Sequence, residues 1–101
     1  MQYKFFRKVV KFLKESNLVE KNVNIRRCKL SKGFDGLCEL KNDTFLIRID
    51  KNLPENHSVD VLIHEFAHAV AWGKDADVHG PNWGKSYSKV YRLFLEKFLN
   101  D

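Results

Sequence analysis

Residues 59–72 combine a helical pattern of apolar residues with two histidines, and no other feature constrains the fold of this chain as strongly. An α-helix turns by about 100° per residue, so residues three and four apart share a face. His64 and His68 therefore lie roughly 40° apart on one face, one turn from each other. A separate face collects apolar side chains suited to a core: Val59, Leu62, Ile63, Phe66 and Val70. The segment predicts a helix that packs against a core and presents a pair of histidines.

Two further helices are predicted, one near each end of the chain. Apolar residues at helical spacing predict the first over residues 3–16, and Pro81 suits the first turn of the last. The central helix is expected to begin near Asn56 to Ser58, both good N-cap residues. It should end at Trp72, because the following glycine fits a left-handed position just past a helix end.

Three strands are predicted between the first and second helices. β-branched and aromatic residues support them, and turns rich in Gly, Asn and Asp separate them. Their ranges are 23–30, 37–40 and 44–50. The order of elements predicts an α+β fold in which a three-stranded, mostly antiparallel sheet packs with three helices.

Composition limits the architecture and the compartment. The 101 residues are expected to form one domain over positions 1–101, and an apolar fraction of 44% suffices for a modest core. No apolar run approaches the length of a membrane span, and the first residues interleave charges too closely for a secretory signal. We therefore expect no membrane association and a cytoplasmic location. Cys28 and Cys38 are too few for a disulfide scaffold.

Positive charge is concentrated in the first third of the chain. The net charge is +5, yet residues 1–32 carry ten Lys and Arg against two acids, whereas residues 33–101 carry eight against eleven. A basic surface of this kind could contact DNA or another polyanion. An ordinary solvated helix face explains the same charges, so both interpretations stay open. The candidate contacts lie on the polar side of the first helix: Lys4, Arg7, Lys8 and Lys11.

A third histidine follows the pair after a polar loop. His79 opens the run His-Gly-Pro-Asn-Trp-Gly, and Gly80-Pro81 fixes a turn beside it. Two imidazoles one turn apart can reach a single ion, but a catalytic zinc usually has three protein ligands and an open position for water. We therefore predict that His64, His68 and His79 bind Zn²⁺.

Three carboxylates are alternatives to His79 as the third ligand. Asp75 and Asp77 lie in the loop, and carboxylates also bind zinc. Glu96 lies far along the last helix, where some zinc hydrolases place a glutamate ligand. The fourth histidine, His57, lies at the start of the central helix and is expected to be exposed.

Glu65 directly follows the first histidine, as a hydrolytic zinc site requires. Its expected role is that of a general base, which takes a proton from a water molecule and later passes it to a leaving amine. A solvated surface glutamate is the alternative interpretation.

The run from Leu62 to Ala69, followed by Trp72 and then by Asp77 to Trp83, resembles the SprT-like zinc metalloproteases. That family includes the Spartan proteases, which act on DNA–protein crosslinks. The match resembles short members from bacteria and phages in particular, because the Trp-Gly after His-Gly-Pro recurs there. The specific similarity covers about residues 59–92.

The resemblance implies a minimal zincin fold, His64, His68 and His79 as zinc ligands, and Glu65 as the catalytic base of peptide-bond hydrolysis. It also implies a protein or peptide substrate that pairs with an edge strand, for which we expect Thr44–Asp50. Two departures concern the Spartan proteases: the loop between His68 and His79 is shorter, and no Cys-rich zinc ribbon follows. A DNA-binding role would therefore depend on the basic first third.

Other roles stay open from the residues alone. Tyr87 and Tyr91 are candidate stabilisers of a tetrahedral intermediate, although tyrosines at helical spacing usually belong to a core. Trp83 is expected to pack under the site. A metal-stabilised module that binds nucleic acid without catalysis is one alternative function. Another zinc hydrolase chemistry, on amides or phosphoesters, is a second.

Overall fold

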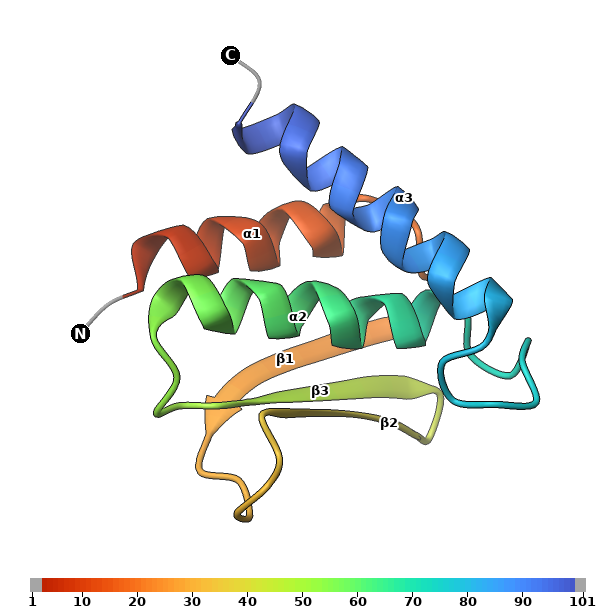
Figure 1. The fold of residues 1–101 in the computed structure, drawn as a ribbon, viewed down its shortest axis with the longest axis horizontal. Helices are drawn as coiled ribbons and strands as arrows, with labels where there is room; N and C mark the ends of the chain where they lie inside the picture. Colours follow the sequence, from red (N-terminus) through yellow and green to blue (C-terminus); the bar gives the residue numbers. More distant parts are fainter. Residues whose placement is uncertain (1–2, 100–101) are drawn as a thin grey trace.

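The computed structural model describes residues 3–99, so the outermost positions of the predicted 1–101 domain lie outside the described residues. Within this range, three helices and three strands form an α+β fold, which confirms the predicted class (Figure 1). No helix among these residues is long and apolar enough to cross a membrane. The elements are α1 Lys4–Glu15, β1 Asn22–Cys28, β2 Gly36–Lys41, β3 Thr44–Asp50, α2 Glu55–Val70 and α3 Pro81–Phe98.

The sheet has the strand order β1-β3-β2, which corrects two expectations. It is mixed rather than mostly antiparallel, because β1 runs parallel to β3 and only β2 is antiparallel to it. Thr44–Asp50 is the central strand and not an edge. Asn42 and Asp43 form the two-residue turn between β2 and β3, both with the positive φ that such hairpins require. The chain after β1 must pass the position of β3 to reach β2, and the strand patterns carry no sign of this crossing.

All three helices lie on one side of the sheet (Figure 1). Alternate residues of β3 are buried, and Ile47 and Ile49 have no exposed surface. The same core takes Phe6, Val9 and Leu13 from α1. The helix α2 runs across the sheet and contributes the largest share of the core: Val59, Leu62, Ile63 and Phe66. It is therefore held between the sheet below and the other helices above.

The start of α2 differs from the sequence-based expectation. The helix begins at Glu55 with Pro54 as its N-cap, not at Asn56 to Ser58, and it ends at Val70, two residues before the expected Trp72. Ser58 is fully buried, and its backbone N–H already donates to the carbonyl of Pro54. Glu55 also reaches back to α1, where its carboxylate accepts a hydrogen bond from the backbone N–H of Phe6 at 3.0 Å. This contact fixes the two helix starts together, and with them the axial position of α2.

Candidate metal centre and cleft

Three histidine side chains converge at the end of α2. His64 and His68 are partly buried on α2, and His79 reaches them from the exposed loop between α2 and α3. The Nε2 atom of His64 lies 3.3 Å from Nε2 of His68 and 3.2 Å from Nε2 of His79. One ligand atom from each of the three histidines lies within 4.8 Å of the others, so the three could hold a single metal ion.

The spacing of these nitrogens fits an ion better than hydrogen bonds. A neutral imidazole nitrogen has either one proton or one lone pair, so Nε2 of His64 cannot bond to both neighbours at once. Nitrogens bound tetrahedrally at 2.0–2.1 Å, the length of a zinc–nitrogen bond, lie about 3.3–3.4 Å apart. The two measured separations are close to this value.

His64 and His68, the two histidines of α2, are in the neutral form that binds metals. Burial, with smaller contributions from the nearby His64 and His79, lowers the pKa of His68 to about 4. Burial also lowers the pKa of His64, with a smaller contribution from His79. Both imidazoles are therefore unprotonated at neutral pH, which leaves their lone pairs free for coordination.

Hydrogen bonds to Asp75 hold the loop that carries His79. This carboxylate accepts hydrogen bonds from the backbone N–H of Trp83 at 2.8 Å and of Asn82 at 3.0 Å, and from the Asn82 side chain at 2.9 Å. Desolvation raises the pKa of Asp75, but these hydrogen bonds outweigh it and the net shift is downward. Asp75 thus caps the N-terminus of α3, where free N–H groups favour an anion, and its oxygens are already engaged.

Aromatic side chains of α3 pack beside the histidine cluster and behind it. Trp83 stacks on His68 with ring centroids 5.4 Å apart, and its indole N–H donates to the carbonyl of His64 at 3.4 Å. Tyr87 stacks on Trp83 in turn, and its ring centroid lies 6.4 Å from that of His64. Tyr91 packs one turn further along α3, against Tyr87 and Phe94. The structure therefore brings Tyr87 to the edge of the histidine cluster and leaves Tyr91 behind it.

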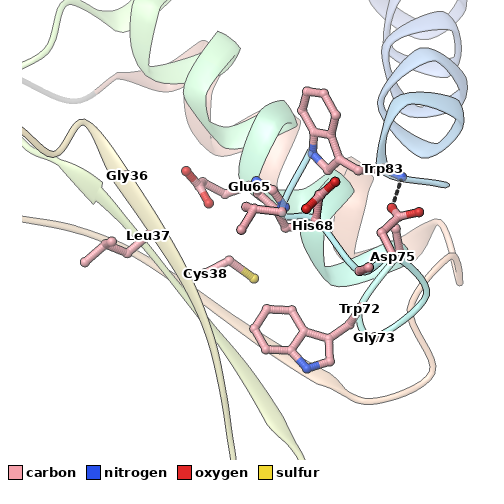
Figure 2. A pocket seen from close by; sticks show the side chains of 13 residues that line it. Gly36, Leu37, Cys38, Glu65, His68, Trp72, Gly73, Asp75 and Trp83 are labelled. Atoms are coloured by element: carbon pink, nitrogen blue, oxygen red, sulfur yellow. Dashed lines mark hydrogen bonds between the residues drawn. The ribbon is translucent and has the colours of Figure 1, made fainter. Parts of the chain in front are cut away.

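Glu65 extends from α2 toward β2 (Figure 2). The residue is only 8% exposed, and no hydrogen bond or ion pair to it occurs among residues 3–99. Burial raises its pKa from 4.5 to about 7. A carboxyl group that is half ionised near neutral pH can both take up and release a proton there, which is the property of a general base.

Gly36 allows β2 to approach Glu65 closely. A Cβ atom at this position would lie 2.5 Å from Cγ1 of Val61 and 3.1 Å from Cγ of Glu65, so any other residue would have to displace these side chains. Cys38 follows two residues later on the same face of β2. Burial and the nearby carboxylates of Glu65 and Glu39 raise the pKa of its thiol to about 12, so it stays protonated.

A cleft runs along β2 on both sides of Glu65. One hollow of about 470 Å³ extends from Glu65 past Cys38 to Trp72 and the loop (Figure 2). Another of about 440 Å³ lies on the opposite side, between the start of β2 and the first half of α2. Both are lined by Gly36 and Glu65, so Glu65 lies where the two meet.

Other candidates from the sequence lie away from the centre. Asp77 lines the cleft but is not among the three residues that converge, and Glu96 is exposed on α3. His57 is half exposed, and its Nε2 lies 3.4 Å from Oδ2 of Asp35. The candidate DNA contacts are all exposed on α1, where Arg7 and Lys11 line a groove beside β1; the other two are Lys4 and Lys8.

A comparison with protein families agrees with this geometry. The model of the SprT-like family matches residues 2–98, which is nearly the whole chain. The chain belongs to the SprT-like family. No curated protein matches it.

Sequence patterns of this SprT-like chain give no indication of three features of the site. Gly36 looks like a turn residue, yet it controls the approach of β2 to Glu65. Asp75 caps a helix that begins six residues later, whereas a capping residue normally lies next to its helix. The position of Cys38 beside Glu65 depends on strand order, which the sequence does not specify.

Proposed function

We propose that this SprT-like chain is a zinc-dependent endopeptidase. The observation that carries the proposal is the combination of three histidine nitrogens at the spacing of a zinc site with a buried, unpaired glutamate beside them. Family membership supports the same chemistry. His64, His68 and His79 are the proposed ligands, and a catalytic zinc ion with three protein ligands would keep one position for water.

Glu65 is the proposed general base. A zinc ion at this centre would polarise the scissile carbonyl and make a water molecule more acidic. The carboxylate of Glu65 would take the proton from that water and then deliver it to the nitrogen of the leaving amine. The raised pKa suits both halves of this transfer, because the acid and the base forms are comparably populated near neutral pH.

Substrate would bind as an extended peptide along β2. This strand lies at the end of the order β1-β3-β2, so one of its edges carries backbone groups that no other strand pairs. The cleft follows that strand past Glu65. Main-chain hydrogen bonds to a free edge recognise a peptide without regard to its sequence, which suits an enzyme acting on unfolded segments.

Tyr87 is the better of the two tyrosines as a stabiliser of the tetrahedral intermediate. It lines the hollow beside His64 and Glu65, whereas Tyr91 lines neither hollow. Burial raises the pKa of the Tyr87 hydroxyl, with smaller contributions from Tyr91 and Asp60, so the group remains a hydrogen-bond donor. Tyr87→Phe should lower kcat by about 10- to 100-fold and leave KM nearly unchanged.

The test uses an unfolded protein substrate and the zinc-loaded chain. Wild type should cleave it, Glu65→Gln should be inactive while still binding zinc, and a chelator should abolish cleavage until zinc is restored. Glu96→Gln is the matched control, because Glu96 is exposed on α3, lies outside the histidine cluster and lines neither hollow, so cleavage should stay intact. Equal cleavage by wild type and Glu65→Gln would refute the proposal.

A second function, binding of DNA, is favoured by a basic groove between α1 and β1. The groove measures about 780 Å³, and apolar side chains that include Phe6 and Val10 also line it. Arg27 is already occupied, since it lies over the Tyr3 ring and donates to a backbone carbonyl. Lys11, Lys14 and Arg26 are the proposed phosphate contacts of the lining, to which Arg7 also belongs, and Glu15 is its one acid.

Phosphates of DNA, or of the DNA in a crosslinked substrate, are the proposed ligands of this groove. Binding should weaken steeply with salt. Lys11→Glu combined with Arg26→Glu should lower the slope of log K against log salt concentration by the equivalent of about two phosphate contacts. Lys89→Glu, an exposed change on α3, is the control. Binding that ignores both salt and the double substitution would count against this role.

A further inference from the structure

The cleft is acidic although the protein as a whole is basic. Its two hollows are lined by five carboxylates and by no lysine or arginine, in a chain with a net charge of +5. Asp75 is engaged in capping α3, and Glu65 is the proposed base. The other three carboxylates are Asp35, Asp60 and Asp77, of which Asp35 lies 3.4 Å from Nε2 of the half-exposed His57 in the same hollow.

Two of these acids belong to the hollow beside the first half of α2. Asp35 lies just before β2, and its carbonyl is fixed by a 2.8 Å hydrogen bond from the backbone N–H of Asp50. Asp60 is exposed on α2, one turn before His64, and is close enough to Tyr87 to influence its pKa. Phe34, which is 50% exposed, forms an apolar wall of the same hollow.

The same hollow contains a largely buried residue whose carboxylate has no partner within the described part of the chain. Glu65 lines it, is more than nine-tenths buried and has no hydrogen-bond or ion-pair partner among residues 3–99. His64 also lines it. The hollow is therefore directly adjacent to the proposed point of bond cleavage.

Strand direction decides which side of the scissile bond this is. β2 begins at Gly36, beside the Asp35–Asp60 hollow, and continues past Cys38 toward the hollow beside Trp72. Antiparallel pairing is the more stable arrangement for an added strand. A peptide that pairs in this way has its N-terminal part over the Trp72 hollow and its C-terminal part over the Asp35–Asp60 hollow.

We propose that the Asp35–Asp60 hollow binds a lysine or arginine side chain of the residue immediately after the scissile bond. This inference rests on the proposed peptidase function. The aliphatic stem would pack on Phe34, and the charged end would reach the carboxylates of Asp35 and Asp60. A metal ion at the histidine cluster repels nearby cations, so a long side chain that carries its charge away from the centre is favoured over a short one.

The test compares peptides that are identical except for lysine, glutamine or glutamate after the cleaved bond. Cleavage by the zinc-loaded wild type gives kcat/KM, and fluorescence anisotropy with zinc-loaded Glu65→Gln gives binding without turnover. Two solvent-exposed charge pairs of roughly threefold each predict about a tenfold preference for lysine over glutamine, and a larger one over glutamate. The preference should fall as salt is added.

Variants of Asp60 identify the source of the preference. Asp60→Asn should reduce it about threefold, and Asp60→Lys should shift the preference toward glutamate. Asp43→Asn is the matched control, because Asp43 is an exposed acid on the β2–β3 turn that pairs with Lys21 instead. Circular dichroism checks that each variant is folded.

The outcomes separate this inference from the peptidase proposal. Zinc- and Glu65-dependent cleavage without any preference for lysine, or a preference that Asp60→Lys leaves unchanged, would overturn the inference and leave the peptidase intact. Absence of cleavage would refute the peptidase, and the anisotropy measurement would still decide the charge preference of the hollow. Equal affinity for the three peptides would then overturn it.

Discussion

Replacement of Glu65 by glutamine should stabilise the metal-free protein, and increasingly so as the pH rises. The carboxyl group is buried without a hydrogen-bond or ion-pair partner within the described part of the chain, and this burial raises its pKa from 4.5 to about 7. Between these pH values the folded protein keeps a proton that the unfolded chain releases. The free energy of unfolding therefore falls as the pH rises through this window, because the ionised group is better solvated in the unfolded chain.

The size of the effect follows from the two pKa values. Their difference corresponds to about 3 kcal/mol at a pH above both, since each pKa unit is worth 1.36 kcal/mol. Water reaches the carboxylate from the hollows on either side and screens part of this penalty. The free energy of unfolding of Glu65→Gln minus that of wild type should therefore be about 1–2 kcal/mol larger above pH 7 than below pH 4.5.

Urea denaturation of both proteins in a chelator measures this difference across the pH range. His64 and His68 titrate in both proteins, so their contributions cancel in the comparison. A carbon NMR titration of the Glu65 carboxyl gives the pKa directly. A difference in stability that is constant with pH, together with an NMR pKa near 4.5, would refute the conclusion that Glu65 is desolvated.

Three substitutions test other parts of the site. Gly36→Ala should destabilise the fold by about 1–3 kcal/mol in urea denaturation, because its Cβ would lie 2.5 Å from Val61 Cγ1; a neutral effect would contradict the close approach of β2 to α2. Asp75→Ala should weaken zinc binding in a competition titration with a chelator, because the loop that carries His79 loses its attachment to α3. Unchanged zinc affinity would show that the cap does not position that loop. Leu62→Ala should cost about 2–5 kcal/mol, since this side chain is fully buried; a loss below 1 kcal/mol would mean that the core around α2 is loosely packed.

The helix that carries the histidine pair was predictable because its signals are local. Apolar residues at a spacing of three and four, together with His64 and His68, predict both the helix and the face that holds the pair. The left-handed conformation of Gly73 was predictable for the same reason, and its φ is +77°. The boundaries of the helix were not predictable: it ends at Val70 rather than Trp72, and Ser58 has the side chain of a good N-cap but is buried in the core.

Strand order and the shape of the cleft could not be predicted, because they depend on contacts between distant segments. Nothing in residues 44–50 distinguishes a central strand from an edge strand, and the order β1-β3-β2 requires the chain after β1 to pass the position of β3 before it forms β2. The acidic hollow combines Asp35 from one segment with Asp60 from another. Only the folded arrangement places them on either side of one space beside Glu65.

The central claim is that three histidines from two segments bind one zinc ion, and metal analysis of the purified protein tests it most directly. We predict one zinc ion per chain in wild type and in His57→Ala, whose imidazole lies outside the cluster. His79→Ala should lose most of the zinc, because two ligands on a helix make a weak site. Full zinc occupancy in His79→Ala, or equal loss in His57→Ala, would contradict the account.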